Sequence, residues 1–137
     1  MLDLEADVFD YVSGKVTEEY PDTYFTTEYN PTPPSFPAVS IREVDNREAN
    51  RYRTAEGERA SAVMFEVAVY SNKVGNKRSE SREIAVAVDD AMRSIGFTRR
   101  SKNNVPNYND ATIDRLVMRY EGTIIPNDDG KFYVHYQ

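Results

Sequence analysis

The chain has 137 residues, of which 39% are hydrophobic, enough for one folded domain with one core and too few for two ordinary domains. It contains no cysteine, which excludes a disulfide scaffold, a zinc ribbon and a cysteine nucleophile, and its single histidine, His135, is too little for a histidine-based metal site or catalytic triad. The net charge of −6 argues against a general nucleic-acid binder. Because no segment reads as a signal peptide or a membrane span, we expect a protein that is cytoplasmic when made and has no membrane partner.

The first quarter of the chain predicts a helix, a strand and a stiff connector. Apolar residues four apart predict a helix over residues 3–20, with Asp3 as its cap, and Pro21 ends it. Residues 23–29 are almost all β-branched or aromatic and predict a strand. Four prolines then make residues 30–37 an extended connector, or a proline-rich ligand for a partner groove. Residues 38–44 alternate again and predict a second strand.

Residues 45–59 form an almost wholly polar stretch with no apolar face to bury. Between two strands, such a stretch predicts a long loop or arm, which is usually disordered or used in contact. Arginine and tyrosine are common at interfaces, so we interpret it as a partner-contact loop. Its candidate contact residues are Arg47, Arg51, Tyr52, Arg53 and Arg59.

The central stretch, residues 60–96, predicts a long strand followed by a helix. Val63, Phe65, Val67 and Val69 alternate with more polar positions, which is the pattern of a strand with one strongly apolar face. After a polar loop at residues 71–77, apolar residues from Ile84 onward recur at helical spacing. Ser79 or Ser81 is the expected N-cap of this helix, and Gly96 its stop.

The remaining residues predict strands at 97–102, 112–125 and 132–136, separated by turn-forming segments rich in Asn, Asp and Pro. Strands therefore outnumber crossover helices. The expected fold is a single α+β domain over residues 1–137, with a mostly antiparallel sheet of four to six strands and two helices packed on one face.

Charge is distributed unevenly along the sequence. Residues 1–30 carry eight acidic side chains against one lysine, whereas the middle of the chain is locally basic. This difference indicates either two solvated faces of opposite sign or a head-to-tail contact between identical subunits. The candidate subunit-interface charges are Lys73, Lys77, Arg78, Arg99 and Arg100.

Catalytic and ligand-binding motifs are weak or missing. There is no glycine-rich phosphate loop and no nucleophile elbow. Asp89–Asp90 would project roughly 100° apart on a helix, and Asp128–Asp129 suits a turn. Asn107, Asn109 and Asp110 resemble the start of a calcium loop but lack its glycine and distal glutamate. We therefore expect no catalytic, metal or cofactor site, and scattered basic residues give only a weak case for DNA contact.

Four segments together resemble the small tail-terminator or tail-completion proteins of long-tailed bacteriophages. They are FPAVSIREVDN (Phe36–Asn46), FEVAVYSNK (Phe65–Lys73), DDAMRSIGFTR (Asp89–Arg99) and VPNYNDATIDRLVMRYEG (Val105–Gly122). The resemblance implies an α+β structural virion protein without catalysis or cofactor. It also implies a ring, expected to be a hexamer, at the head-proximal end of the tail tube, which ends tube polymerisation and joins the tail to the head.

The partners implied by the resemblance are other copies of the chain, the tail tube protein and a head-side connector or stopper protein, with DNA only as cargo passing through the lumen. The expected location is the virion tail or neck, after assembly in the host cytoplasm. Two alternatives stay open. One is a head-completion or stopper protein of the same neck region. The other is a small carboxylate-site enzyme, with Asp110 or Asp114 as candidate groups.

Overall fold

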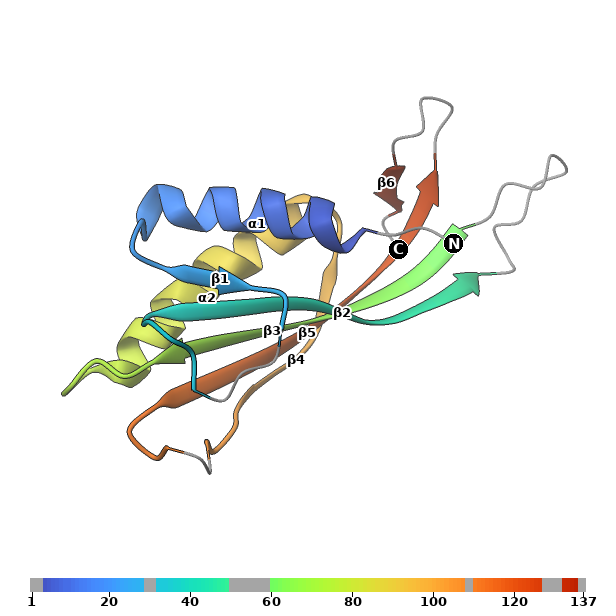
Figure 1. The fold of residues 1–137 in the computed structure, drawn as a ribbon. Helices are drawn as coiled ribbons and strands as arrows, with labels where there is room; N and C mark the ends of the chain where they lie inside the picture. The colour runs from blue at the N-terminus through green and yellow to red at the C-terminus, as the bar shows by residue number, and fades with distance from the viewer. Residues whose placement is uncertain (1–3, 29–31, 50–59, 108–109, 127–131, 136–137) are drawn as a thin grey trace, which may run out of the picture.

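The computed structural model describes residues 4–28, 32–49, 60–107, 110–126 and 132–135. It contains two helices and a six-stranded sheet, in the order α1 (Glu5–Glu19), β1 (Tyr24–Thr26), β2 (Ala38–Ala49), β3 (Ala60–Ser71), α2 (Lys77–Ser94), β4 (Thr98–Asn104), β5 (Asp114–Pro126) and β6 (Phe132–His135). Both helices lie on one face of the sheet (Figure 1). The predicted α+β class, with helices on one face, is confirmed.

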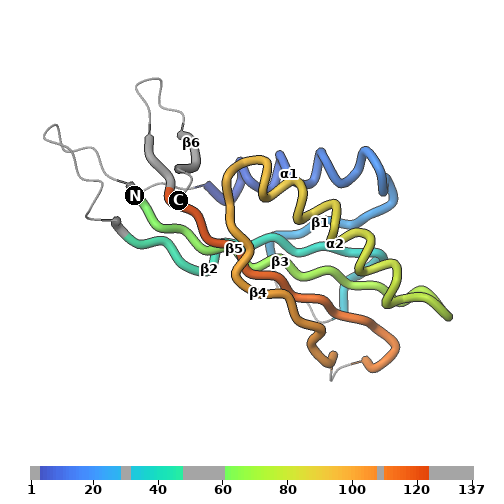
Figure 2. Tube along the Cα trace, turned by 180° about the vertical axis from the view of Figure 1, so that it is seen from behind, coloured from blue at the N-terminus to red at the C-terminus, as the bar shows by residue number. Residues whose placement is uncertain are grey.

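The strands follow the spatial order β1-β2-β3-β5-β4, and β6 also pairs with β5. Only the short β1–β2 pair is parallel; β2–β3, β3–β5, β4–β5 and β5–β6 are antiparallel. β4 pairs with β5 from Leu116 to Glu121, and β6 pairs with it from Thr123 onward, so the two strands follow one another along β5 (Figure 2).

The main core lies between the sheet and the two helices, as the periodicity predicted. Val63, Phe65, Val67 and Val69 of β3 are each fully buried there. Helix α1 contributes Val8, Val12 and Val16, and α2 contributes Ile84, Val88 and Met92, which are the residues that the helical spacing selects. Phe65 and Phe97 meet edge to face with ring centroids 5.4 Å apart.

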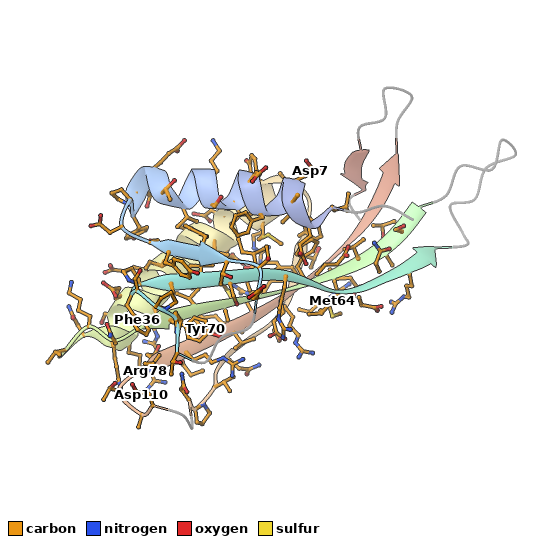
Figure 3. All side chains as sticks on the ribbon, viewed as in Figure 1. Asp7, Phe36, Met64, Tyr70, Arg78 and Asp110 are labelled. Carbon is orange, nitrogen blue, oxygen red and sulfur yellow. The ribbon has the colours of Figure 1, made fainter. Side chains whose placement is uncertain are left out.

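A smaller cluster lies on the opposite face of the sheet. It consists of Ala38, Ala68, Tyr70, Ile113 and Val117, with Phe36 and Val105 packed against it. Phe36 belongs to the proline-containing segment before β2, and Figure 3 shows it near Tyr70. The connector therefore covers part of this second face, which supports the interpretation of a linker that carries the chain from one strand to the next.

Three local predictions were wrong. The N-cap of α1 is Leu4, not Asp3. Helix α2 begins at Lys77 after Asn76, not at Ser79 or Ser81; Ser81 is instead buried in the second turn. The 45–59 stretch is not a loop from its start, because Asp45–Ala49 continue β2 and pair with Ala60–Met64 after a register shift between Glu43 and Asp45. Backbone pairing does not need an apolar face, so the polar composition concealed this strand. Gly96, with a φ of 94°, follows the end of α2 as expected.

Candidate interaction surfaces

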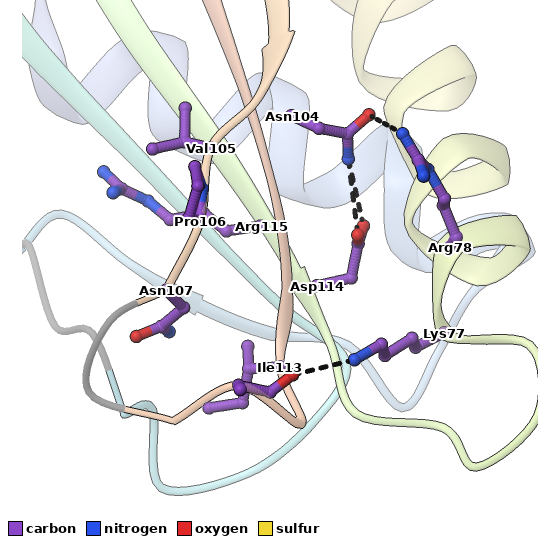
Figure 4. A pocket seen from close by; sticks show the side chains of 10 residues that line it. Lys77, Arg78, Asn104, Val105, Pro106, Asn107, Ile113, Asp114 and Arg115 are labelled. Atoms are coloured by element: carbon purple, nitrogen blue, oxygen red, sulfur yellow. Dashed lines mark hydrogen bonds between the residues drawn. The ribbon is translucent and has the colours of Figure 1, made fainter.

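One candidate surface is the basic end of the molecule, where a turn connects β3 to α2. Lys77 and Arg78 form the first turn of α2, and Lys73 precedes them in the connecting turn. Lys77 Nζ donates a hydrogen bond to the carbonyl oxygen of Ala111 at 2.9 Å, and Arg78 Nη2 donates to Asn104 Oδ1 at 3.3 Å (Figure 4). Three of the five predicted interface cations thus come together at one end of the fold.

A hydrogen-bonded network holds this end in place. The Ser81 hydroxyl donates to Asp114 Oδ2, and Asn104 Nδ2 donates to Asp114 Oδ1 at 3.3 Å. These contacts join α2 to β5 and β4, because each of the three residues belongs to a different element. Beside them lies an open hollow of about 470 Å³, lined by Lys77, Arg78, Asn104–Asn107, Ala111 and Ile113–Arg115. The network fixes the positions of the cations that border the hollow.

The other two predicted interface cations form ion pairs within the subunit. Arg99 Nη1 lies 3.3 Å from Asp89 Oδ1, and Arg100 Nε lies 3.6 Å from Glu121 Oε2. Asp89 also accepts hydrogen bonds from Arg93 Nε at 2.8 Å and from the Tyr120 hydroxyl at 2.7 Å. Arg99 therefore helps to stabilise a charge cluster between α2 and the sheet, besides any role at an interface.

The Asp89 cluster has perturbed protonation equilibria. Partial burial opposes ionisation of Asp89, but hydrogen bonds from Tyr120 and Arg93 and the charges of Arg99 and Arg93 outweigh it and lower its pKa. Burial, together with the hydrogen bond to Asp89 and the charge of Asp89, raises the pKa of the Tyr120 phenol well above its usual range. The cluster therefore holds an ionised carboxylate against a neutral phenol.

Of the five predicted partner-contact residues, the structure describes only Arg47. This residue lies on β2, is exposed, and pairs with Asp45 at 3.1 Å. Arg51, Tyr52, Arg53 and Arg59 lie outside the described residues.

One polar group on the sheet was missed by the sequence analysis. Glu66 is almost fully buried on the face opposite the helices and pairs with Arg42 at 3.0 Å and with Arg119 at 3.1 Å. These residues stand directly opposite one another on β2, β3 and β5. In the sequence, this group is visible only as a glutamate within an apolar strand. Its two arginine partners can be identified only from the register of the strands.

Two of the aspartates considered as metal ligands, Asp89 and Asp110, accept hydrogen bonds within the subunit. Asp110 Oδ1 accepts hydrogen bonds from the backbone N–H of Thr112 at 2.9 Å and from its hydroxyl at 2.6 Å, as expected for a turn aspartate. These bonds lower the pKa of Asp110. Within the described part of the chain, no three His, Cys, Asp or Glu side chains are grouped to hold a metal ion. Asn109, Asp128 and Asp129 lie outside that part.

The described helices include none that is long and apolar enough to cross a membrane. The protein is a small α+β domain. The clusters around Asp89, Asp114 and Glu66 each join helices or strands of the same subunit.

Residues 14–124 match the family described as tail completion protein gp17, and the chain therefore belongs to that family. A chain from a solved structure titled "Virion of native gene transfer agent (GTA) particle" has the same fold, with a TM-score of 0.66 over 89% of this chain and 94% of that chain, at 14% sequence identity. No curated protein sequence matches. Family membership makes the protein a structural component of the virion tail and not an enzyme, so the alternative of a carboxylate-site enzyme is wrong.

Proposed function

We propose that the protein forms a closed ring, a hexamer, at the head-proximal end of the tail tube, where it ends tube polymerisation and joins the tail to a head-side connector or stopper protein. The observation that carries this proposal is the family match over residues 14–124, which assigns the chain to tail completion. In this role the protein is assembled in the host cytoplasm, and DNA passes through the ring only as cargo.

The distribution of charge supports association between copies. The exposed side of α1 carries Asp7, Asp10 and Glu18, whereas Lys73, Lys77 and Arg78 gather where β3 meets α2. Asp7 on α1 and Arg78 at the start of α2 lie on different parts of the molecule (Figure 3). A contact between unlike surfaces is heterologous, and such contacts generate rings when the rotation between copies closes.

The extension of β2 and β3 supports a contact with a second protein. Their paired ends, Asp45–Ala49 and Ala60–Met64, project beyond the helices (Figure 1). They flank the sequence that contains Arg51, Tyr52, Arg53 and Arg59, residue types that are enriched at interfaces. In the proposed function, this sequence contacts the tail tube or the head-side connector.

The test uses the purified full chain, alone and mixed with the tail tube protein of the same phage. Mass determination and electron microscopy should reveal rings, or tubes that are capped at one end and no longer grow. A protein that ignores tubes but binds a portal-side connector would instead be a head-completion protein. A monomer that binds neither partner would refute the proposal.

A paired variant tests the contact sequence separately from ring formation. Replacing Arg51 and Arg53 with Glu should leave rings intact but abolish tail-to-head joining in an assembly assay. Lys102→Glu, which reverses an exposed cation on β4, is the matched control and should join normally. Unchanged joining by the Arg51 and Arg53 variant would remove this sequence from the proposed contact.

A further inference from the structure

The turn between β3 and α2 presents an apolar side chain to solvent. We refer to Lys73–Asn76 as the β3–α2 tip. The backbone N–H of Asn76 donates to the carbonyl oxygen of Lys73 at 3.3 Å, and Gly75 has a φ of 88°, which glycine adopts without strain. Val74, between them, is 98% exposed, the largest exposed fraction among the described large hydrophobic residues.

Hydrogen bonds fix the base of the tip. The Ser71 hydroxyl donates to Glu80 Oε1 at 2.6 Å, which joins the end of β3 to the first turn of α2. The backbone N–H of Lys73 donates to Ser71 Oγ at 3.3 Å. Because the turn is held in this way, Val74 is presented with little conformational entropy left to lose on binding.

Positive charge surrounds the tip. Lys73 is exposed and forms no ion pair with the described residues, and Lys77 and Arg78 follow it at the start of α2. An open hollow of about 620 Å³ lies beside the tip, lined by Asn72–Ser79, Ala111 and Thr112. An apolar side chain bordered by cations fits a partner that offers a small gap between carboxylates.

The chain itself offers such a partner on the outer side of α1. Asp7, Asp10, Gly14 and Glu18 follow one another at helical spacing, opposite the buried Val8, Val12 and Val16. The three acids form no ion pair with the described residues.

The described part of the subunit does not explain why residue 14 is a glycine. A Cβ atom at this position would meet no atom of the described residues within 4 Å, and Gly14 does not have a positive φ. A glycine inside a helix weakens it relative to alanine. What Gly14 does provide is bare helix backbone between Asp10 and Glu18, to which another side chain can approach closely.

We infer that Val74 of one copy packs over Gly14 of the next copy, with Lys73 and Lys77 facing Asp10 and Glu18. Charge complementarity selects a second copy of this chain as the occupant. The inference rests on the proposed ring and names its subunit contact. The contact is heterologous, because the tip and the outer side of α1 are different surfaces.

Disulfide cross-linking tests the contact directly, because the chain has no cysteine of its own. A double variant, Gly14→Cys with Val74→Cys, should form a ladder of covalent oligomers on mild oxidation, and the ladder should end at the ring size. The control is Gly14→Cys with Val86→Cys, since Val86 is also exposed but lies on α2. A ladder from the control alone, or from neither variant, would overturn the contact.

A second variant guards against effects on folding. Gly14→Ala should raise the unfolding temperature of the subunit and yet weaken self-association at least 10-fold, because the added methyl group occupies the space of Val74. Val86→Ala should leave association unchanged. If Gly14→Ala associates as strongly as the wild type, the contact is overturned. If the same variant still caps tubes, the proposed function is unaffected. Cross-linked oligomers that never cap tubes would support the contact and refute the proposed function.

Discussion

The hydrogen bond from Tyr120 to Asp89 should be a measurable part of the stability of the subunit. Tyr120→Phe removes a hydroxyl that lies 2.7 Å from the carboxylate and keeps the fully buried ring. Hydrogen bonds to charged groups contribute roughly 1.5–3 kcal/mol. For a chain of this length, we expect the unfolding temperature to fall by roughly 5–15 °C.

The loss should depend on pH with a defined sign. The pKa of Asp89 is lower in the folded state than in the unfolded state, so its stabilisation is present above the unfolded pKa of about 4 and is lost as the pH falls through the folded pKa. The effect of Tyr120→Phe on the free energy of unfolding should therefore shrink on acidification. The pKa of Tyr120 is raised in the folded state, so the wild type should lose stability as the pH rises past about 10, the unfolded pKa of tyrosine. Tyr120→Phe has no phenol at this position and should not show this loss.

Urea denaturation at several pH values measures this prediction. Tyr11→Phe is the matched control, because the Tyr11 hydroxyl forms a hydrogen bond with Ser94 Oγ at 2.8 Å at an exposed site without a carboxylate. Its effect should be small and the same from pH 3 to pH 7. A Tyr120→Phe effect that is equally independent of pH over this range would refute the role assigned to the ionised Asp89.

Three further changes test the core and the basic end of the molecule. Val67→Asp places an unpaired charge at a fully buried position and should abolish folding, seen as loss of the circular dichroism signal; a folded variant would contradict the assignment of β3 to the core. Phe65→Ala should reduce the free energy of unfolding by about 3–5 kcal/mol in urea, and a much smaller loss would mean that the cavity collapses. Ser81→Ala removes the donor to Asp114 and should lower the free energy of unfolding by about 1–3 kcal/mol, whereas no change would show that the network is not stabilising.

The parts of the fold that were predicted from sequence are those with a simple hydrophobic period. The alternation from Val63 to Val69 and the spacing of Val8, Val12 and Val16 identify buried faces, because each period matches a single backbone geometry. The stop of α2 at Gly96 followed from the conformational freedom of glycine.

The errors arose where backbone pairing or tertiary contacts decide the structure. Asp45–Glu48 are all polar, yet they pair with β3, and no hydrophobic pattern marks such a segment. Ser81 has the residue type of an N-cap, but the nearby Asp114 makes it a buried donor within the helix. In both cases the deciding partner is distant in sequence.

The same limit applies to the candidate surfaces. The sequence separates acidic from basic regions, but it cannot distinguish the exposed Lys73 from Arg99, which pairs with Asp89. Glu66 has partners on two neighbouring strands, and only the register brings Arg42 and Arg119 opposite it. Charge predicts that a surface exists, whereas the sheet decides which charges remain available to a partner.

This distinction guides where we propose the subunit contacts of the ring. The clusters around Asp89, Asp114 and Glu66 each join two or more elements of the subunit, so their cause is internal. Val74 and Gly14 differ, because an exposed valine and a glycine within a helix both weaken the isolated subunit or leave it unimproved. If copies of the chain form the proposed ring, a contact with another copy would explain features that have no benefit inside one copy. That reasoning makes the β3–α2 tip and the outer side of α1 the first places to test for subunit contact.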